Sequence, residues 1–97
     1  MESKKKVLVA DAGEEFRRLA VDTLSAEADF IVVGSTGDGE DACRLTRELA
    51  PDVILMDLVL SRMDGLEVVR TIHGMNPRPR ILVLSSFANG AMAAQAA

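Results

Sequence analysis

Two short apolar runs that each end in an aspartate constrain this chain more than any other feature. Residues 7–10 are followed by Asp11, and residues 53–56 are followed by Asp57. A buried strand cannot carry a charge in its interior, whereas its exit to solvent can. If the two runs are neighbouring parallel strands, both carboxylates emerge at the carboxyl edge of one sheet, where open α/β folds bind ligands. The pattern therefore predicts a cation site and allows a reactive carboxylate.

Strand-like and helix-like segments alternate along the chain, which predicts an α/β fold with right-handed crossovers and a parallel sheet. The apolar, β-prone runs are residues 7–10, 30–33, 53–56 and 81–84. Apolar residues recur at helical spacing in three segments between them, which begin near Glu14, Asp38 and Asp64. The run 53–56 is apolar at every position, as expected of a central strand covered on both faces. The alanine-rich residues 88–97 are expected to form most of a fourth helix.

Composition limits the size and the chemistry of the chain. With 97 residues, 48% of them hydrophobic, residues 1–97 fit a single small domain. A net charge of -4 and a pI near 4.9 argue against nucleic acid as a partner, since phosphate backbones need a basic face. No stretch approaches the roughly 20 apolar residues of a membrane span, and no apolar signal segment follows the first residues. We therefore expect a soluble, cytoplasmic protein.

Residues 57–65, Asp-Leu-Val-Leu-Ser-Arg-Met-Asp-Gly, carry a resemblance to a known family. They resemble the loop after the third strand in receiver domains of two-component response regulators, where the aspartate accepts a phosphoryl group. Asp11, the Pro51-Asp52 pair and Ser85 match the same family, so that the resemblance covers essentially the whole chain. It implies a flavodoxin-like parallel sheet with strand order 2-1-3-4. It also implies phosphorylation of Asp57 by a histidine kinase or a phosphorelay.

Such an acceptor needs a divalent cation, because a phosphoryl group and a carboxylate are both anions. Asp11 and Asp57 would supply the Mg²⁺ site, since two close carboxylates without metal repel and one tends to hold a proton. Asp57 would then attack phosphorus and form an acyl phosphate. The resemblance adds the backbone carbonyl of Val59 as a metal ligand and the Ser85 hydroxyl as a hydrogen-bonding partner of the phosphoryl oxygens.

Each of these residues also has a purely structural interpretation. Asp57 could simply end a strand, Ser85 could end another, and Asp11 could cap the first helix as well as bind metal. Asp64 is expected to cap the third helix rather than to bind metal.

Several departures from the receiver pattern lie at the same site. Receivers usually carry a second acid where this chain has Ala12, so Mg²⁺ affinity is expected to fall, with Glu14 as a candidate helper. Leu60-Ser61 replaces the usual Met-Pro, which is expected to loosen the loop. The family's fifth strand, the lysine before it and the fifth helix would lie beyond the last residue, so we expect an incomplete receiver. Arg62 is the only cation near the site in sequence, a weak substitute for that lysine.

A missing fifth strand would leave residues 81–84 as an open sheet edge, which invites pairing with another chain. We therefore expect a homodimer or higher oligomer, built through that strand or through residues 88–97. Residues 84–87, Leu-Ser-Ser-Phe, look most like receivers of sporulation transcription regulators of the stage-zero master regulator family. Regulators that carry a helix-turn-helix output domain come close behind in this resemblance. We expect the DNA-binding half of such a regulator to lie outside residues 1–97.

Three functions remain open. The first is the phosphoacceptor switch of a transcription regulator, which is no enzyme beyond self-phosphorylation from a phosphodonor. The second is a pseudo-receiver, a dimerisation or interaction module that cannot hold phosphate because of Ala12 and the lost lysine. The third is a flavodoxin-shaped nucleotide-binding enzyme. It is disfavoured because the turn after the first strand is Asp-Ala-Gly rather than a glycine-rich phosphate cradle.

Overall fold

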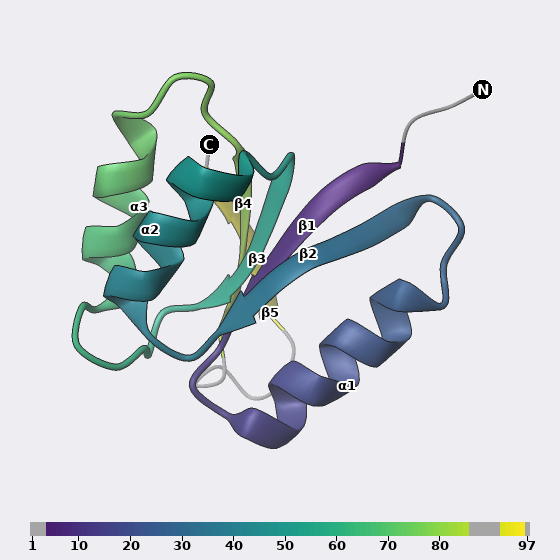
Figure 1. Ribbon diagram of the computed structural model, residues 1–97. Helices are drawn as coiled ribbons and strands as arrows, with labels where there is room; N and C mark the ends of the chain where they lie inside the picture. The colour runs from purple at the N-terminus through teal and green to yellow at the C-terminus, as the bar shows by residue number, and fades with distance from the viewer. Residues whose placement is uncertain (1–3, 86–91, 97) are drawn as a thin grey trace.

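Four strands and three helices lie where the sequence predicts them, and a fifth strand follows (Figure 1). The structure is a computed structural model that describes residues 4–85 and 92–96. The strands are β1 (Lys5–Ala10), β2 (Phe30–Thr36), β3 (Val53–Asp57), β4 (Arg80–Ser85) and β5 (Met92–Ala96). The helices are α1 (Glu14–Ser25), α2 (Gly39–Leu49) and α3 (Gly65–His73).

Four parallel strands form the part of the sheet that carries the predicted site. The strand order is β2-β1-β3-β4-β5, and the pairs β1–β2, β1–β3 and β3–β4 are all parallel. The predicted flavodoxin-like α/β fold with strand order 2-1-3-4 is therefore confirmed. Because β3 lies between β1 and β4 with helices on both sides of the sheet, each of its residues before Asp57 is apolar.

The end of the chain differs from its prediction. Met92–Ala96 form β5, which pairs antiparallel with β4, where most of a helix was expected over residues 88–97. The remaining residues of that range lie outside the described residues. Pairing with β5 gives the backbone N–H and C=O groups along β4 partners that a helix would leave unmet, and this outweighs the helical preference of alanine. The prediction of β4 as an open edge is therefore wrong, because β5 pairs with it. The open edge can no longer serve as the reason to expect a homodimer through β4.

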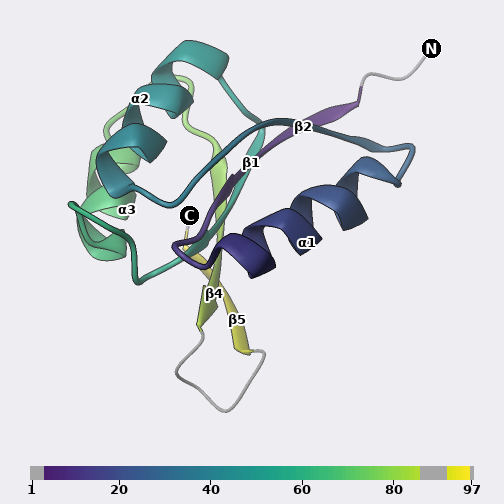
Figure 2. The ribbon, with the colours of Figure 1, turned by 60° about the horizontal axis from the view of Figure 1, so that its bottom comes forward.

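The two faces of the sheet are covered unequally. Helices α2 and α3 lie side by side on one face, and α1 lies on the other (Figures 1 and 2). Side chains alternate along β1, so that Leu8 and Ala10 pack towards α2 and α3, whereas Val7 and Val9 pack towards α1. The larger buried cluster lies on the α2/α3 face: Leu8, Ala10, Ala42, Cys43, Ile54, Met56, Val68, Ile72, Ile81 and Val83.

Aspartates cap α2 and α3, at the two helix starts that the sequence predicts near Asp38 and Asp64. Asp38 Oδ1 accepts the Glu40 N–H at 2.9 Å, and Asp64 Oδ1 accepts the Glu67 N–H at 3.0 Å. Helix α2 ends at Leu49, and the C-cap residue Ala50 adopts a left-handed conformation with φ of 48°. Among the described residues, no helix is both long and apolar enough to cross a membrane.

Candidate functional site

The parallel register brings the two predicted aspartates to the same edge of the sheet. Ala10 of β1 lies opposite Met56 of β3, so Asp11 and Asp57 each follow a paired position on neighbouring strands. Both residues are nearly buried, with 9% of Asp11 and 8% of Asp57 exposed. Two acids that are far apart in sequence therefore lie at one edge of the sheet, as predicted, although both are less exposed than a strand exit to solvent implies.

Each carboxylate is oriented by a backbone N–H two residues further along the chain. The Gly13 N–H donates to Asp11 Oδ1 at 2.8 Å, and the Val59 N–H donates to Asp57 Oδ1 at 3.2 Å. The Asp11 N–H donates to the Thr36 carbonyl oxygen at 2.9 Å, which ties the exit of β1 to β2. Asp11 does not cap α1, since the residue at the N-cap position of that helix is Gly13. The turns hold both acids at the strand exits.

The electrostatics of Asp11 reflect its surroundings. Burial raises the pKa of Asp11, the Gly13 N–H lowers it, the charge of Asp57 raises it and Arg17 lowers it, with a raised pKa as the net result. Arg17 Nη1 also donates to the Asp11 carbonyl oxygen at 2.6 Å. Arg17 was not expected at this site, because only the loop after Asp57 was considered as a source of a cation. Its place in the first turn of a helix that starts close behind β1 was the signal.

The loop between Asp57 and α3 is closed at its base by a glycine. The Gly65 N–H donates to the Leu58 carbonyl oxygen at 2.8 Å. A Cβ atom on Gly65 would lie 2.5 Å from Leu58 Cα, so only glycine allows this close approach. The Asp64-Gly65 pair therefore both caps α3 and closes the loop. Val59 lies within this loop, with 47% of the residue exposed.

The donor set fits a magnesium ion, although it is small. Among the described residues, no group of three or more His, Cys, Asp or Glu side chains is placed to hold a metal ion. Mg²⁺ commonly uses one or two carboxylates together with phosphate and water oxygens. Asp11 and Asp57 supply these two carboxylates. Because the two negative charges repel each other in a buried site, a cation between them would be stabilising. The exposed Glu14 side chain pairs with Arg18 at 3.5 Å, and its part as a helper stays a prediction.

The other residues predicted for the site have different outcomes. The Arg62 guanidinium donates to Asp38, and its part as a weak substitute for the lysine stays a prediction. Ser85 ends β4, one residue beyond Leu84, which pairs with Asp57. The Ser85 side chain lies outside the described part of the structure, so the role of its hydroxyl stays a prediction, as does that of the Val59 carbonyl.

Comparisons with known proteins show which family and which relatives this chain resembles. Residues 7–97 match the family model of the response regulator receiver domain. The transcriptional regulatory protein LiaR of Bacillus subtilis is 44% identical over 82 residues, 84% of this chain and 39% of LiaR. A protein-glutamate methylesterase/protein-glutamine glutaminase of Halalkalibacterium halodurans is 38% identical over 91 residues, 94% of this chain and 26% of that protein. The solved signal receiver domain of NarL from Mycobacterium tuberculosis is 31% identical with a TM-score of 0.85, over 92% of this chain and 72% of that one.

The chain therefore belongs to the response regulator receiver family. Receiver domains generally bind Mg²⁺ at their phosphorylation site and interact with histidine kinases or phosphotransfer proteins. The chain spans 39% of LiaR and 26% of the methylesterase, so the activity of any longer protein is a separate question. These relatives do not support the predicted membership of the sporulation master regulator family.

Proposed function

We propose that this chain is the signal-receiving domain of a transcription-controlling response regulator and is phosphorylated on Asp57. The supporting observation is the pair of nearly buried carboxylates that the sheet brings together, Asp11 and Asp57. The phosphoryl donor would be a histidine kinase or phosphotransferase, and the protein would act in the cytoplasm. Similarity to LiaR favours a transcriptional output, and similarity to a methylesterase makes an enzymatic output the other candidate. The receiver itself would catalyse no reaction beyond its own phosphorylation.

In this mechanism the chain holds and orients a carboxylate nucleophile. A carboxylate oxygen of Asp57 attacks the phosphorus of a phosphohistidine, so that an O–P bond forms while the P–N bond breaks and the imidazole leaves. The Val59 N–H fixes Asp57 Oδ1 during this step. Bound Mg²⁺, held by Asp11, Asp57 and the Val59 carbonyl, would supply positive charge between the two anions. The Ser85 hydroxyl would donate a hydrogen bond to a phosphoryl oxygen of the product.

Intact-mass spectrometry after incubation with acetyl phosphate and Mg²⁺ tests the proposal. We expect the wild-type chain to gain one phosphoryl group and the Asp57→Asn variant to gain none. Asp52→Asn is the matched control, because Asp52 is exposed at the other end of β3, where its carboxylate accepts the Lys6 N–H at 2.8 Å. This control should react like the wild type. A wild-type chain that gains no phosphoryl group would contradict the proposal.

A second candidate function, a pseudo-receiver that serves as an interaction module, is favoured by one observation. Ala12 is exposed directly after Asp11 and supplies no carboxylate where receivers usually have a second acid. A Mg²⁺ titration followed by NMR separates the two candidates. The phosphoacceptor predicts millimolar binding by the wild type and tighter binding by Ala12→Asp, whereas the pseudo-receiver predicts binding by Ala12→Asp alone. If the pseudo-receiver works as a homodimer through β5, light scattering would report twice the mass of one chain.

A further inference from the structure

The loop that follows Asp57 is fastened to the loop between β2 and α2. The Ser61 N–H donates to the Gly37 carbonyl oxygen at 3.1 Å, and the Gly39 N–H donates to the Ser61 carbonyl oxygen at 2.9 Å. The Ser61 hydroxyl also donates to the Gly37 carbonyl oxygen at 2.9 Å. Asp38 and Ser61 thereby form an isolated parallel β-bridge. Two loops that lie more than 20 positions apart in sequence are thus joined as in a small sheet.

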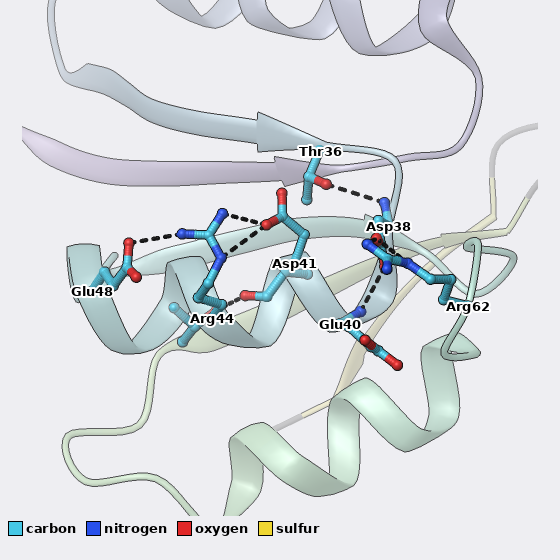
Figure 3. Close-up of polar contacts among 9 residues, drawn as sticks. Thr36, Asp38, Glu40, Asp41, Arg44, Glu48 and Arg62 are labelled. Atoms are coloured by element: carbon cyan, nitrogen blue, oxygen red, sulfur yellow. Dashed lines mark hydrogen bonds and ion pairs between the residues drawn. The ribbon is translucent and has the colours of Figure 1, made fainter.

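A charged pair reinforces this bridge at its exposed side. Arg62 Nε donates to Asp38 Oδ2 at 2.6 Å, and Arg62 Nη2 contacts the same oxygen. Figure 3 shows the Arg62 guanidinium directed at Asp38, whose carboxylate also accepts the Glu40 N–H. The hydrogen bond from Arg62 lowers the pKa of Asp38. One aspartate therefore serves both as the cap of α2 and as the anchor of the neighbouring loop.

The backbone at this contact has little freedom. Arg62 adopts a left-handed conformation with φ of 67°, which is unfavourable for a residue with a side chain. A Cβ atom on Gly39 would lie 2.8 Å from Met63 Cβ and closer still to the Met63 carbonyl oxygen. The two loops therefore meet without space for a methyl group. Such a conformation persists only where surrounding contacts hold it in place.

Val59 lies between two fixed points of this loop. Its N–H is held by Asp57 Oδ1, and Ser61, two residues further, is held by Gly37. The sequence predicts a loosened loop because Leu60-Ser61 replaces Met-Pro, yet the structure fastens Ser61 from outside. We propose that Gly37, Asp38, Gly39, Ser61 and Arg62, the loop clamp, position the Val59 carbonyl for the divalent cation. Asp38 and Arg62 are positioning residues in it, and this inference rests on the proposed function.

The test measures Mg²⁺ affinity by NMR in the full 97-residue chain with Asp38→Asn and with Arg62→Gln. Asparagine still caps α2, so Asp38→Asn removes the ion pair and keeps the helix start. Arg44→Gln is the matched control: Arg44 is 55% exposed against 66% for Arg62, and pairs with Asp41 and Glu48 within α2 only (Figure 3). Urea unfolding midpoints that agree between Arg62→Gln and Arg44→Gln exclude a general loss of fold.

The clamp and a simple charge effect predict different signs. Removing the Arg62 charge would strengthen Mg²⁺ binding and removing the Asp38 charge would weaken it, if long-range attraction alone mattered. The clamp predicts that both substitutions weaken binding, by roughly tenfold as for other residues that support metal ligands. We also expect faster amide hydrogen exchange at Ser61 in both variants and no change in Arg44→Gln. The double variant should be no weaker than either single variant, because each breaks the same contact.

Three results would overturn the inference. These are wild-type affinity in both variants, opposite effects of the two substitutions, or no Mg²⁺ binding by the wild type. Phosphorylation is measured separately. A wild type that binds Mg²⁺ but takes no phosphoryl group would defeat the proposed function, while the clamp would still be judged on metal affinity and hydrogen exchange.

Discussion

The α2/α3 face and the α1 face are two sides of one sheet, yet they bury very different amounts of apolar side chain. Ten buried residues form the cluster beneath α2 and α3, whereas Val7, Val9 and Ala20 alone form the buried cluster found beneath α1 in the described residues. On α1 itself, 62% of Leu19 remains exposed. Since burial of apolar area is the main source of folding free energy, the α2/α3 face contributes more to stability.

The two acids and the loop after Asp57 lie on different sides with respect to these two faces. Asp11 and Asp57 continue the alternation of Val9 and Leu55, which pack on the α1 side. The loop after Asp57, by contrast, is fastened to the start of α2. The edge that carries Asp11 and Asp57 therefore adjoins the thinly covered face, and the loop after Asp57 is anchored on the densely packed one. A functional site needs such a rigid base if its groups are to keep their geometry.

The largest expected effect comes from a pair of identical substitutions, one on each face. Val68→Ala in α3 should lower the free energy of unfolding by about 2–3 kcal/mol, because it removes two fully buried methyl groups and leaves a cavity. Val21→Ala in α1 should cost about 1 kcal/mol or less, since Val21 is only half-buried and alanine favours the helix. Urea denaturation measures both values. Equal losses would break the comparison between the faces.

A smaller effect, of opposite sign, is expected at the end of α2. Ala50 has a left-handed φ of 48°, a conformation that glycine adopts without the cost that a Cβ atom brings. Ala50→Gly should therefore raise the free energy of unfolding by about 1 kcal/mol, without any new side-chain contact. Thermal or urea unfolding measures the gain. The control is Ala26→Gly at the end of α1, where φ is -79° and glycine should give no gain.

The smallest effect concerns the burial of Asp11, which should make the free energy of unfolding depend on pH. Burial raises the pKa of Asp11 in the folded state. The contribution of Asp11 to the free energy of unfolding is therefore fully present below its ordinary pKa of 3.8, and it is lost as pH rises through the raised pKa. Asp11→Asn should therefore be more stable than the wild type at pH 7, with a difference that shrinks as pH falls towards 3.8. Unfolding curves across this range measure it. Asp22→Asn, on the exposed side of α1, is the control, and a pH-independent difference for Asp11→Asn would refute the prediction.

Much of the fold could be predicted because the local sequence patterns of its strands and helices match the burial that each element has in the structure. The all-apolar run in β3 indicated its central place, and the aspartates at 38 and 64 marked two helix starts. Strand β2 was expected over residues 30–33 but continues to Thr36. A register shift between Val7 and Leu8 absorbs one residue there, and this depends on the partner strand rather than on local sequence.

The site was predictable where strand exits decide it and unpredictable where loops meet. Asp11 and Asp57 converge because parallel strands in register must end together. The partner of Arg62 is Asp38, a residue on another loop, so no spacing rule points to it. The strand at Met92–Ala96 was missed for a similar reason, since alanine prefers a helix until a neighbouring strand offers its backbone.

The two glycines at the starts of α2 and α3 limit how this sequence can change over generations. Gly39 and Gly65 each face the backbone of another segment at a distance that leaves no room for one more carbon atom. Leu60 and Ser61 differ from the residues that the family usually has at these positions, so the loop after Asp57 tolerates replacement. The glycines at positions 39 and 65 do not. A related sequence that keeps this edge of the sheet is therefore expected to keep a glycine at both positions.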